Sequence, residues 1–142
     1  MKTILPIEIF AIEDDGYHLK TTLSINGKAA SVIIDTGASR SVFDENRITN
    51  YINFDELEEH DRLSSGLGTN TMTSKKVELE KLEVGDIVLT NYDATILDLS
   101  HVNASYEKLE LTPIDGILGG DILFDYNAVI DYSKGELVLD KI

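Results

Sequence analysis

Asp35 is the residue whose place in the sequence most strongly indicates chemistry. It directly follows the apolar run Val32-Ile33-Ile34 and precedes Thr36-Gly37-Ala38-Ser39. Three successive β-branched residues predict a buried strand, and a carboxylate is almost never fully buried without a partner. An aspartate at the end of such a strand is therefore either a turn residue or a functional group. Asp-Thr-Gly alone favours the turn, so the choice between a turn residue and a functional group depends on the rest of the sequence.

Two glycine-containing segments further along the chain bear on this choice. Gly66-Leu67-Gly68 lies in a stretch rich in Ser, Thr and Asn, residues 63–74, and this composition predicts the mobile tip of a hairpin. Ile117-Leu118-Gly119, near the C-terminus, belongs to a second apolar strand that is interrupted by glycines.

The three segments together resemble those of the aspartic proteases, and specifically the single-lobe retroviral type, the retropepsins. The pattern of that family is two apolar residues, Asp, Thr or Ser, Gly, and Ala or Ser, followed downstream by two apolar residues and Gly. The resemblance covers the chain from about Tyr17 to Leu139. It implies a mainly β fold, a closed barrel-like acid-protease lobe with two or three short helices that is active as a homodimer. It also implies an aspartic endopeptidase, which hydrolyses peptide or protein substrates.

The implied reaction uses water, with no metal and no covalent intermediate. Two carboxylates about 3 Å apart share one proton, because both cannot be ionised at that distance. The charged carboxylate is the base, the protonated one is the acid, and the pair titrates as a unit. We therefore expect a pH optimum on the acidic side of neutral.

The second carboxylate is expected to come from another copy of the chain. Asp-Thr-Gly occurs once in the sequence, at Asp35. A faint echo of the strand before Asp35 leads to Asp98-Leu99-Ser100, which lacks the glycine. The catalytic pair is then Asp35 and its symmetry mate, with the site on the two-fold axis of a homodimer.

The resemblance also implies roles for the neighbours of Asp35. Gly37 lets the backbone approach the carboxylates so that its N–H can donate a hydrogen bond to them. Thr36 is implied to hydrogen-bond across the dimer axis, Ala38 to stay small beneath the substrate, and Ser39 to support the carboxylate.

Substrate contacts are implied for a flap and for the C-terminal tripeptide. The segment from Leu63 to about Thr73 corresponds to the flap, which closes over a bound peptide and excludes water. The implied flap and substrate-binding residues are Gly66, Leu67, Gly68, Ile117, Leu118 and Gly119.

The sequence departs from the viral members at two positions. They commonly carry an Asp where Ser39 stands and an Arg where Gly120 stands, and those two side chains pair. This sequence replaces both residues of that pair together, which indicates a coherent alternative arrangement of the site. Asp121, after the glycines, matches the retrotransposon-like branch better. The chain is also longer between Asp35 and Ile117, which leaves the flap boundaries and the dimerising strands open.

The composition is that of a globular protein. A length of 142 residues predicts one domain, residues 1–142. The net charge of −14 disfavours nucleic acid as a partner, because its phosphates would be repelled. A basic substrate and simple solubility both fit this charge, and solubility is favoured.

The sequence also argues against membrane proteins, secreted proteins and proteins that need a metal or another cofactor. No apolar run approaches the roughly 18 residues that span a membrane, so no membrane partner is expected. Pro6 and Glu8 interrupt the N-terminal apolar run, so it does not predict a signal peptide, and the simplest expected location is cytoplasmic. The chain has no Cys, and its three His residues are scattered. No metal and no other cofactor is expected.

Short strands separated by turn residues make up most of the predicted structure. Asn26-Gly27 predicts a two-residue hairpin that joins a strand over 17–25 to one over 29–35, so that Asp35 ends the second arm. The acidic segment 53–62 predicts an exposed loop or a ragged helix. Further strands are predicted over 4–12, 41–43, 76–84, 87–89, 94–97, 114–120, 128–132 and 136–139.

Side chains that favour N-caps and turns complete the prediction. Asp44, Ser100 and Asp121 are expected to cap short helices over 45–51, 101–109 and 122–126. Asp115, before Gly116, is expected to be a turn residue, and Asp131, before Tyr132, is expected to be a hairpin-end residue.

Three functions follow from these patterns. The first is an active homodimeric aspartic endopeptidase. The second is a catalytically weak retropepsin-like domain for dimerisation or peptide binding, although such a domain would have no need of the Asp35 carboxylate. The third is a structural β-domain in which Asp35 only forms a turn.

Overall fold

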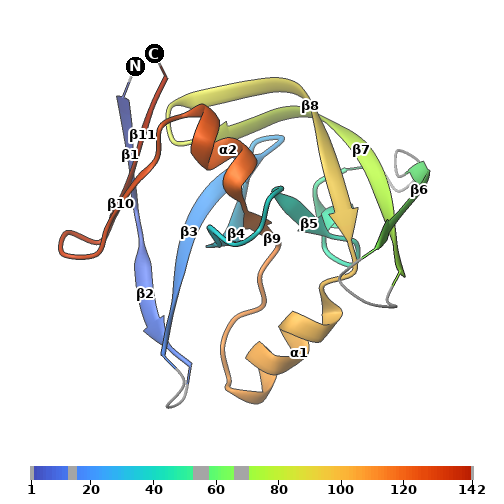
Figure 1. The fold of residues 1–142 in the computed structure, drawn as a ribbon, viewed down its shortest axis with the longest axis horizontal. Helices are drawn as coiled ribbons and strands as arrows, with labels where there is room; N and C mark the ends of the chain where they lie inside the picture. Colours follow the sequence, from blue (N-terminus) through green and yellow to red (C-terminus); the bar gives the residue numbers. More distant parts are fainter. Residues whose placement is uncertain (1, 13–15, 53–57, 66–70, 142) are drawn as a thin grey trace.

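Strands dominate the fold (Figure 1). The computed structural model describes residues 2–12, 16–52, 58–65 and 71–141, with the backbone alone for 58–65 and 71–73. The predicted mainly β class with a few short helices is confirmed. The elements in chain order are β1 (Lys2–Pro6), β2 (Glu8–Ala11), β3 (Tyr17–Ile25), β4 (Lys28–Ile34), β5 (Val42–Asp44), the 3₁₀ turn η1 (Ile48–Asn50), β6 (Glu58–Ser65), β7 (Thr71–Val84), β8 (Ile87–Leu97), α1 (Ser100–Lys108), β9 (Gly116–Leu118), α2 (Gly120–Asp125), β10 (Val129–Asp131) and β11 (Glu136–Asp140).

Six of these strands close into a barrel. They follow the order β3-β4-β9-β5-β8-β7, and β7 pairs again with β3. The closing pairs place Ser24 opposite Glu83 and Ile25 opposite Leu82. The strands β2 and β6 extend β3 and β7 beyond the closed ring. The barrel-like lobe expected from the sequence is therefore present.

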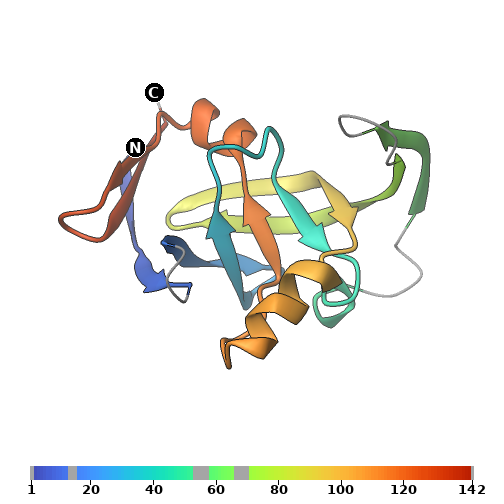
Figure 2. The ribbon, with the colours of Figure 1, turned by 60° about the horizontal axis from the view of Figure 1, so that its bottom comes forward.

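The centre of the barrel has an approximate internal two-fold arrangement. Strand β4 runs parallel to β9, β5 runs parallel to β8, and β5 and β9 are antiparallel. Figure 2 shows β4, β9 and β5 side by side. The hairpin β3–β4 corresponds in this arrangement to the hairpin β7–β8. Asp35 after β4 therefore corresponds to Asp98 after β8, which accounts for the sequence echo.

The apolar run before Asp35 is buried on both faces of β4. Val32 and Ile34 belong to the barrel core, whereas Ile33 packs on the opposite face against Tyr106 and Ile114. A strand that is buried on both faces and paired on both sides has one register. The position at which the chain reaches the surface, Asp35, is fixed by that register.

A separate three-stranded sheet has the order β1-β11-β10. Its inner face places Leu5, Leu137 and Leu139 in the barrel core. Strands β1 and β11 pair antiparallel, so the two ends of the chain lie side by side (Figure 1). Among the helices described, none is long and apolar enough to cross a membrane.

The predicted helix after Asp44 is wrong. Asp44 is the last residue of β5, and the chain then forms only the single 3₁₀ turn η1. Asp44 is 1% exposed, and its carboxylate accepts the N–H of Leu99 at 2.9 Å. The carboxylate therefore stabilises the parallel pair β5–β8 rather than a helix.

Two other local predictions also fail. Segment 53–62 was expected to be a loop or ragged helix, but residues 58–65 form β6, which pairs antiparallel with β7; residues 53–57 lie outside the part that is described. The predicted strand 4–12 divides at Ile7 into β1, which pairs with β11, and β2, which pairs with β3.

Asp115 is not the turn residue that the sequence predicts. Its side chain is buried and accepts hydrogen bonds from the N–H of Ser31 at 2.8 Å and from Nε of Arg47 at 2.7 Å. Asp131, by contrast, accepts the hydroxyl of Ser133 and the N–H of Lys134, so its prediction as a hairpin-end residue is confirmed.

Helices α1 and α2 lie where the sequence placed them, but they lack the expected caps. The N-cap positions are occupied by Leu99 and Gly119, and neither helix has a side-chain cap hydrogen bond. Asp121 uses its carboxylate in another way, described below.

Candidate active site

The Asp35 loop begins where β4 leaves the barrel. Ile34 pairs with Leu118 in the parallel ladder, and the N–H of Asp35 donates to the carbonyl of Leu118 at 3.0 Å. Side chains change from buried to exposed between Ile34 and Asp35. The carboxylate therefore lies on the surface while its backbone is held by the central sheet.

The carboxylate of Asp35 is oriented by its own loop. Gly37 N–H donates to Oδ1 at 2.9 Å, and Ala38 N–H donates to the Asp35 carbonyl at 3.2 Å. A Cβ on Gly37 would lie 3.2 Å from that Oδ1. Across the described chain Oδ2 of Asp35 accepts no hydrogen bond, so it is open to a water or a second carboxyl group.

The strand β9 and the start of α2 hold the loop from its other side. Gly120 N–H donates to the Ala38 carbonyl at 2.7 Å, and Gly119 N–H donates to Oγ of Ser41 at 2.8 Å. Oδ1 of Asp121 accepts both the N–H of Ser41, at 2.9 Å, and its hydroxyl, at 2.7 Å. These bonds join the chain around Asp35 to the chain around Gly119.

Gly119 is required by the close approach of two backbones. A Cβ at this position would lie 2.7 Å from both C and O of Arg40 and 2.8 Å from O of Ala38. Contacts this short with backbone atoms cannot be relieved by a side-chain rotation. A glycine after the apolar pair is therefore a structural requirement of the clamped loop.

An open cavity of about 430 Å³ lies beside the carboxylate. Apolar and aromatic side chains form much of its wall, with Asp35 at its edge. Such a site, with an exposed carboxylate next to an apolar hollow, can bind an organic side chain and activate a water beside it. The lining includes Tyr17, His18, Ile33, Asp35, Thr36 and Tyr132.

Asp98, the counterpart of Asp35 in the internal two-fold, is engaged locally. It accepts hydrogen bonds from Ser100 N–H at 2.9 Å and from Asn46 Nδ2 at 3.0 Å. Hydrogen bonds from Ser100, and to a smaller extent from Asn46, hold the pKa of Asp98 below its usual value. Its loop also lacks the glycine that donates to Asp35.

A tyrosine beside the clamp is kept neutral. Burial, and after it the charge of Asp121, raise the pKa of Tyr92 to about 12.

Within the residues that are described, no group of three or more His, Asp or Glu is arranged to hold a metal ion.

The structure brings together two of the three predicted segments, residues 35–39 and 117–119. The Leu118 side chain is 1% exposed in the barrel core, and Ile117 packs against the outer cluster with Ile33. Leu118 therefore supports the loop through its backbone and cannot line a pocket with its side chain. Gly66, Leu67 and Gly68 lie outside the described residues, although β6 and β7, which flank them, pair antiparallel.

Sequence reasoning missed the role of Ser41. Its signal was a polar residue directly before the short strand β5 and after the Asp35 loop. The sequence predicts that its partner Asp121 caps a helix, and it does not predict the bond to Ser41, because that bond joins residues 80 positions apart.

Comparisons with known proteins identify relatives of this chain. A family model described as aspartyl protease matches residues 21–122. No curated protein matches the chain. A crystal structure of a retropepsin-like aspartic protease from Rickettsia conorii is 16% identical, with a TM-score of 0.59 over 99% of this chain and 91% of that one. The retroviral protease-like domain of Ddi1 from Leishmania major is 15% identical, with a TM-score of 0.59 over 88% of this chain and 90% of that one. Both share its fold.

Proposed function

The chain belongs to the aspartyl protease family, and from this premise we propose that residues 1–142 act as one aspartic endopeptidase domain. Two Asp35 carboxylates, one from each subunit of a homodimer, activate the water that hydrolyses the peptide bond. The observation that carries this proposal is the exposed Asp35 carboxylate, which Gly37 orients beside an apolar cavity. An aspartate that only formed a turn would not need the clamp from β9 and α2.

The proposed reaction balances with one proton shared between the carboxyl groups. The ionised carboxylate takes a proton from water, and the water oxygen bonds to the carbonyl carbon. The protonated carboxyl group gives its proton to the carbonyl oxygen. In the collapse of the resulting tetrahedral diol, the carboxyl group that is now protonated gives its proton to the amide nitrogen and the C–N bond breaks. One diol hydroxyl gives its proton to the ionised carboxylate, which restores the shared proton. The Gly37 N–H holds Oδ1 of Asp35 in place, and the reaction needs one proton shared between the two carboxyl groups.

The neighbouring residues take supporting roles in this proposal. Thr36 would hydrogen-bond to the partner loop across the axis, and Ser39 would support the carboxylate. Ala38 keeps space beneath the substrate. Gly66-Leu67-Gly68 would form the tip of the flap. The backbone of residues 117–119 would hold the loop in position.

A peptide-library digestion tests this function. We expect wild-type protein to cleave peptides in a pepstatin-sensitive way, and Asp35→Asn to lose cleavage by a factor of about 10³ or more because its pair has no ionisable carboxylate. Asp98→Asn is the matched control, since Asp98 ends the equivalent strand, and it should retain cleavage. Cleavage that survives in Asp35→Asn would rule out the assignment. Peptide binding by wild-type protein without cleavage would instead support the catalytically weak binding domain.

A further inference from the structure

His18 lies beside Asp35 on the wall of the open cavity. Strands β3 and β4 pair antiparallel, and Lys20 opposite Ile33 is the pair of this ladder nearest to the Asp35 loop. Continued by two residues, the same register brings His18 opposite Asp35 on the same face of the sheet. Both residues line the cavity of about 430 Å³. A substrate side chain that enters this cavity next to the reacting carboxylate therefore also meets His18.

Aromatic side chains hold the His18 ring in one orientation. Its Nδ1 lies 2.7 Å from the hydroxyl oxygen of Tyr106 on α1. The ring of Phe10 on β2 packs edge-on against both, with centroid distances of 6.0 Å to each. Tyr106 is only 3% exposed, so this support lies in the interior. A side chain that is fixed from behind in this way can present one polar atom precisely to a ligand.

The bond to Tyr106 determines which nitrogen of His18 carries a hydrogen on the cavity side. Within the described chain the Tyr106 hydroxyl has no other partner, so it donates to Nδ1. The neutral ring then carries its hydrogen on Nε2, and the charged ring carries one there as well. Nε2 faces away from Tyr106 and donates to no residue that the structure describes. The cavity therefore has an unused N–H donor beside Asp35.

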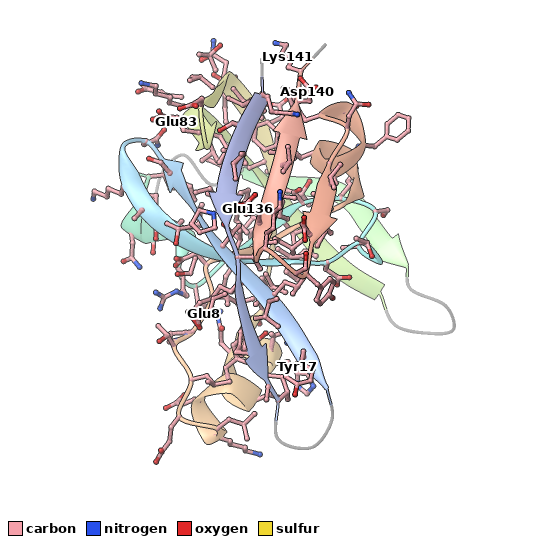
Figure 3. The ribbon with its side chains drawn as sticks, turned by 90° about the vertical axis from the view of Figure 1, so that its left-hand side faces the viewer. Glu8, Tyr17, Glu83, Glu136, Asp140 and Lys141 are labelled. Atoms are coloured by element: carbon pink, nitrogen blue, oxygen red, sulfur yellow. The ribbon has the colours of Figure 1, made fainter. Side chains whose placement is uncertain are left out.

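Two exposed tyrosines also line this cavity. Tyr17 is 70% exposed and Tyr132 is 62% exposed. Figure 3 shows Tyr17 at the start of β3, beside the end of β2. Neither hydroxyl is hydrogen-bonded to another of the described residues. Their rings offer apolar contact, and their hydroxyl oxygens accept hydrogen bonds from a ligand.

We infer that this cavity selects peptides with a carboxamide side chain, glutamine or asparagine, next to the cleaved bond. His18 Nε2–H donates to the carboxamide oxygen, and the tyrosine hydroxyls accept its N–H groups. A carboxylate of the same shape would be repelled by the negative charge of the Asp35 pair. An apolar side chain would leave the His18 donor without a partner. This inference rests on the proposed function, because that function supplies the peptide and the bond that is cleaved.

Three peptides that differ only at the two residues flanking the cleaved bond test this selectivity. Both flanking residues are varied because the homodimer has one cavity on each side of the bond. They are Gln, or Met of similar length without the amide, or Glu of the same shape with a negative charge. We expect wild-type protein to cleave the Gln peptide with a kcat/KM about tenfold or more above that of the other two. A preference for the Met or the Glu peptide would overturn the inference.

Substitution of His18 tests whether the preference depends on its N–H group. His18→Phe keeps an aromatic ring and removes the donor, so the ratio of kcat/KM between the Gln and Met peptides should fall to less than about twofold. His18→Gln restores an N–H donor and should recover part of the ratio. His101→Phe is the matched control, since His101 is an exposed histidine on α1 outside the cavity lining, and it should keep the wild-type ratio. An unchanged ratio in His18→Phe would reject the assignment.

Tyr106 is inferred to be a positioning residue for His18. Tyr106→Phe leaves the imidazole in the cavity but frees its orientation, and it should lower the same ratio about two- to fivefold. Tyr51→Phe is the control, because it removes a hydroxyl that donates to the Ala29 carbonyl at 3.0 Å and does not line this cavity. Equal losses in Tyr51→Phe and Tyr106→Phe would contradict a specific role of the bond between Tyr106 and His18.

Peptide binding to Asp35→Asn separates this inference from the proposed function. The variant keeps His18 and is expected not to cleave, so fluorescence anisotropy of the same labelled peptides gives their dissociation constants. Tighter binding of the Gln peptide, in a protein whose wild type cleaves none of the three, would retain the carboxamide site and reject the protease function. Cleavage by wild-type protein without preference for the Gln peptide would retain the function and reject this site. A protein that neither binds nor cleaves the peptides would overturn both.

Discussion

The hydroxyl of Ser41 donates a 2.7 Å hydrogen bond to Oδ1 of Asp121, and this bond ties the Asp35 loop to α2. The Ser41 oxygen also accepts the N–H of Gly119, and the same Asp121 oxygen accepts the N–H of Ser41. Ser41 is 2% exposed, so these groups are paired away from water. A buried donor that loses its partner costs about 1–3 kcal/mol.

Removal of the Ser41 hydroxyl should destabilise the protein strongly, although the substitution removes only one oxygen atom. We expect Ser41→Ala to lower the free energy of unfolding by about 2–3 kcal/mol, because Gly119 N–H and Asp121 both lose a buried partner. Ser133→Ala is the matched control, since its hydroxyl donates to Asp131 at the same 2.7 Å in an exposed hairpin. It should cost less than about 1 kcal/mol. Urea unfolding measures both, and equal losses would contradict the structural importance of the buried clamp.

The adjacent glycines Gly119 and Gly120 should differ sharply in how well they tolerate substitution by alanine. Gly119→Ala places a Cβ 2.7 Å from the Arg40 backbone, whereas the Cβ of Gly120→Ala lies 3.3 Å from its nearest neighbour, the Ala38 carbonyl. We expect a loss of about 1–3 kcal/mol and most of the peptide cleavage for the first, because the Asp35 loop must shift. The second should change stability by less than about 1 kcal/mol. Thermal unfolding and cleavage rates test this, and an unaffected Gly119→Ala variant would contradict it.

The Arg47–Asp115 pair should matter far more than an exposed pair. Asp115 is buried, and Arg47 Nε lies 2.7 Å from its Oδ1. Arg47→Met leaves a buried carboxylate without its counter-charge, and we expect a loss of about 2–4 kcal/mol. Lys76→Met breaks the exposed pair with Asp93 and should cost less than about 1 kcal/mol. Chemical denaturation compares them. The interpretation would be contradicted by a larger loss in Lys76→Met.

Three tyrosines should make the fold sensitive to alkali. Burial raises the pKa of Tyr51, Tyr92 and Tyr106 to about 12 in each case, whereas an unfolded tyrosine titrates near 10. The folded chain holds these protons more tightly. Their contribution to stability is therefore complete below about pH 10 and is lost as the pH rises from 10 towards 12.

Melting temperatures and tyrosinate absorbance, measured from about pH 10 to about pH 12, test whether stability is lost as the pH rises. The melting temperature should fall above about pH 10, and it should fall less steeply in Tyr92→Phe, which removes one of the three groups. A melting temperature that stays constant to about pH 12 would contradict the expectation.

The features that the sequence predicts well are local. Asn26-Gly27 forms the expected hairpin turn, with positive φ angles of 50° and 86° at its two residues. The run Val32-Ile33-Ile34 forms a strand buried on both faces. Neighbouring residues alone determine such features, and they place Asp35 at the end of β4. The family resemblance implied a role for Gly119 in substrate binding, and it did not predict the contact of Gly119 with the Arg40 backbone.

The features that the sequence misses depend on distant partners. Asp115-Gly116 has the composition of a turn, but its carboxylate binds Arg47, 68 positions away. Asp44 has the composition of a helix cap, but it binds Leu99, 55 positions away. The acidic segment 53–62 has no strand periodicity, but residues 58–65 form β6 because β7 offers them a backbone partner. Tertiary pairing overrides local preference in each case.

The shared Asp35 pair is tested most directly by mixing subunits. A dimer with one Asp35→Asn subunit lacks half of its catalytic pair, so wild-type protein that exchanges subunits with a roughly ninefold excess of Asp35→Asn should keep only about a tenth of its cleavage activity. The same excess of Asp98→Asn, which retains Asp35, should cause no such loss. Activity of the wild-type protein that stays constant after complete exchange with Asp35→Asn would contradict a catalytic centre built from two subunits.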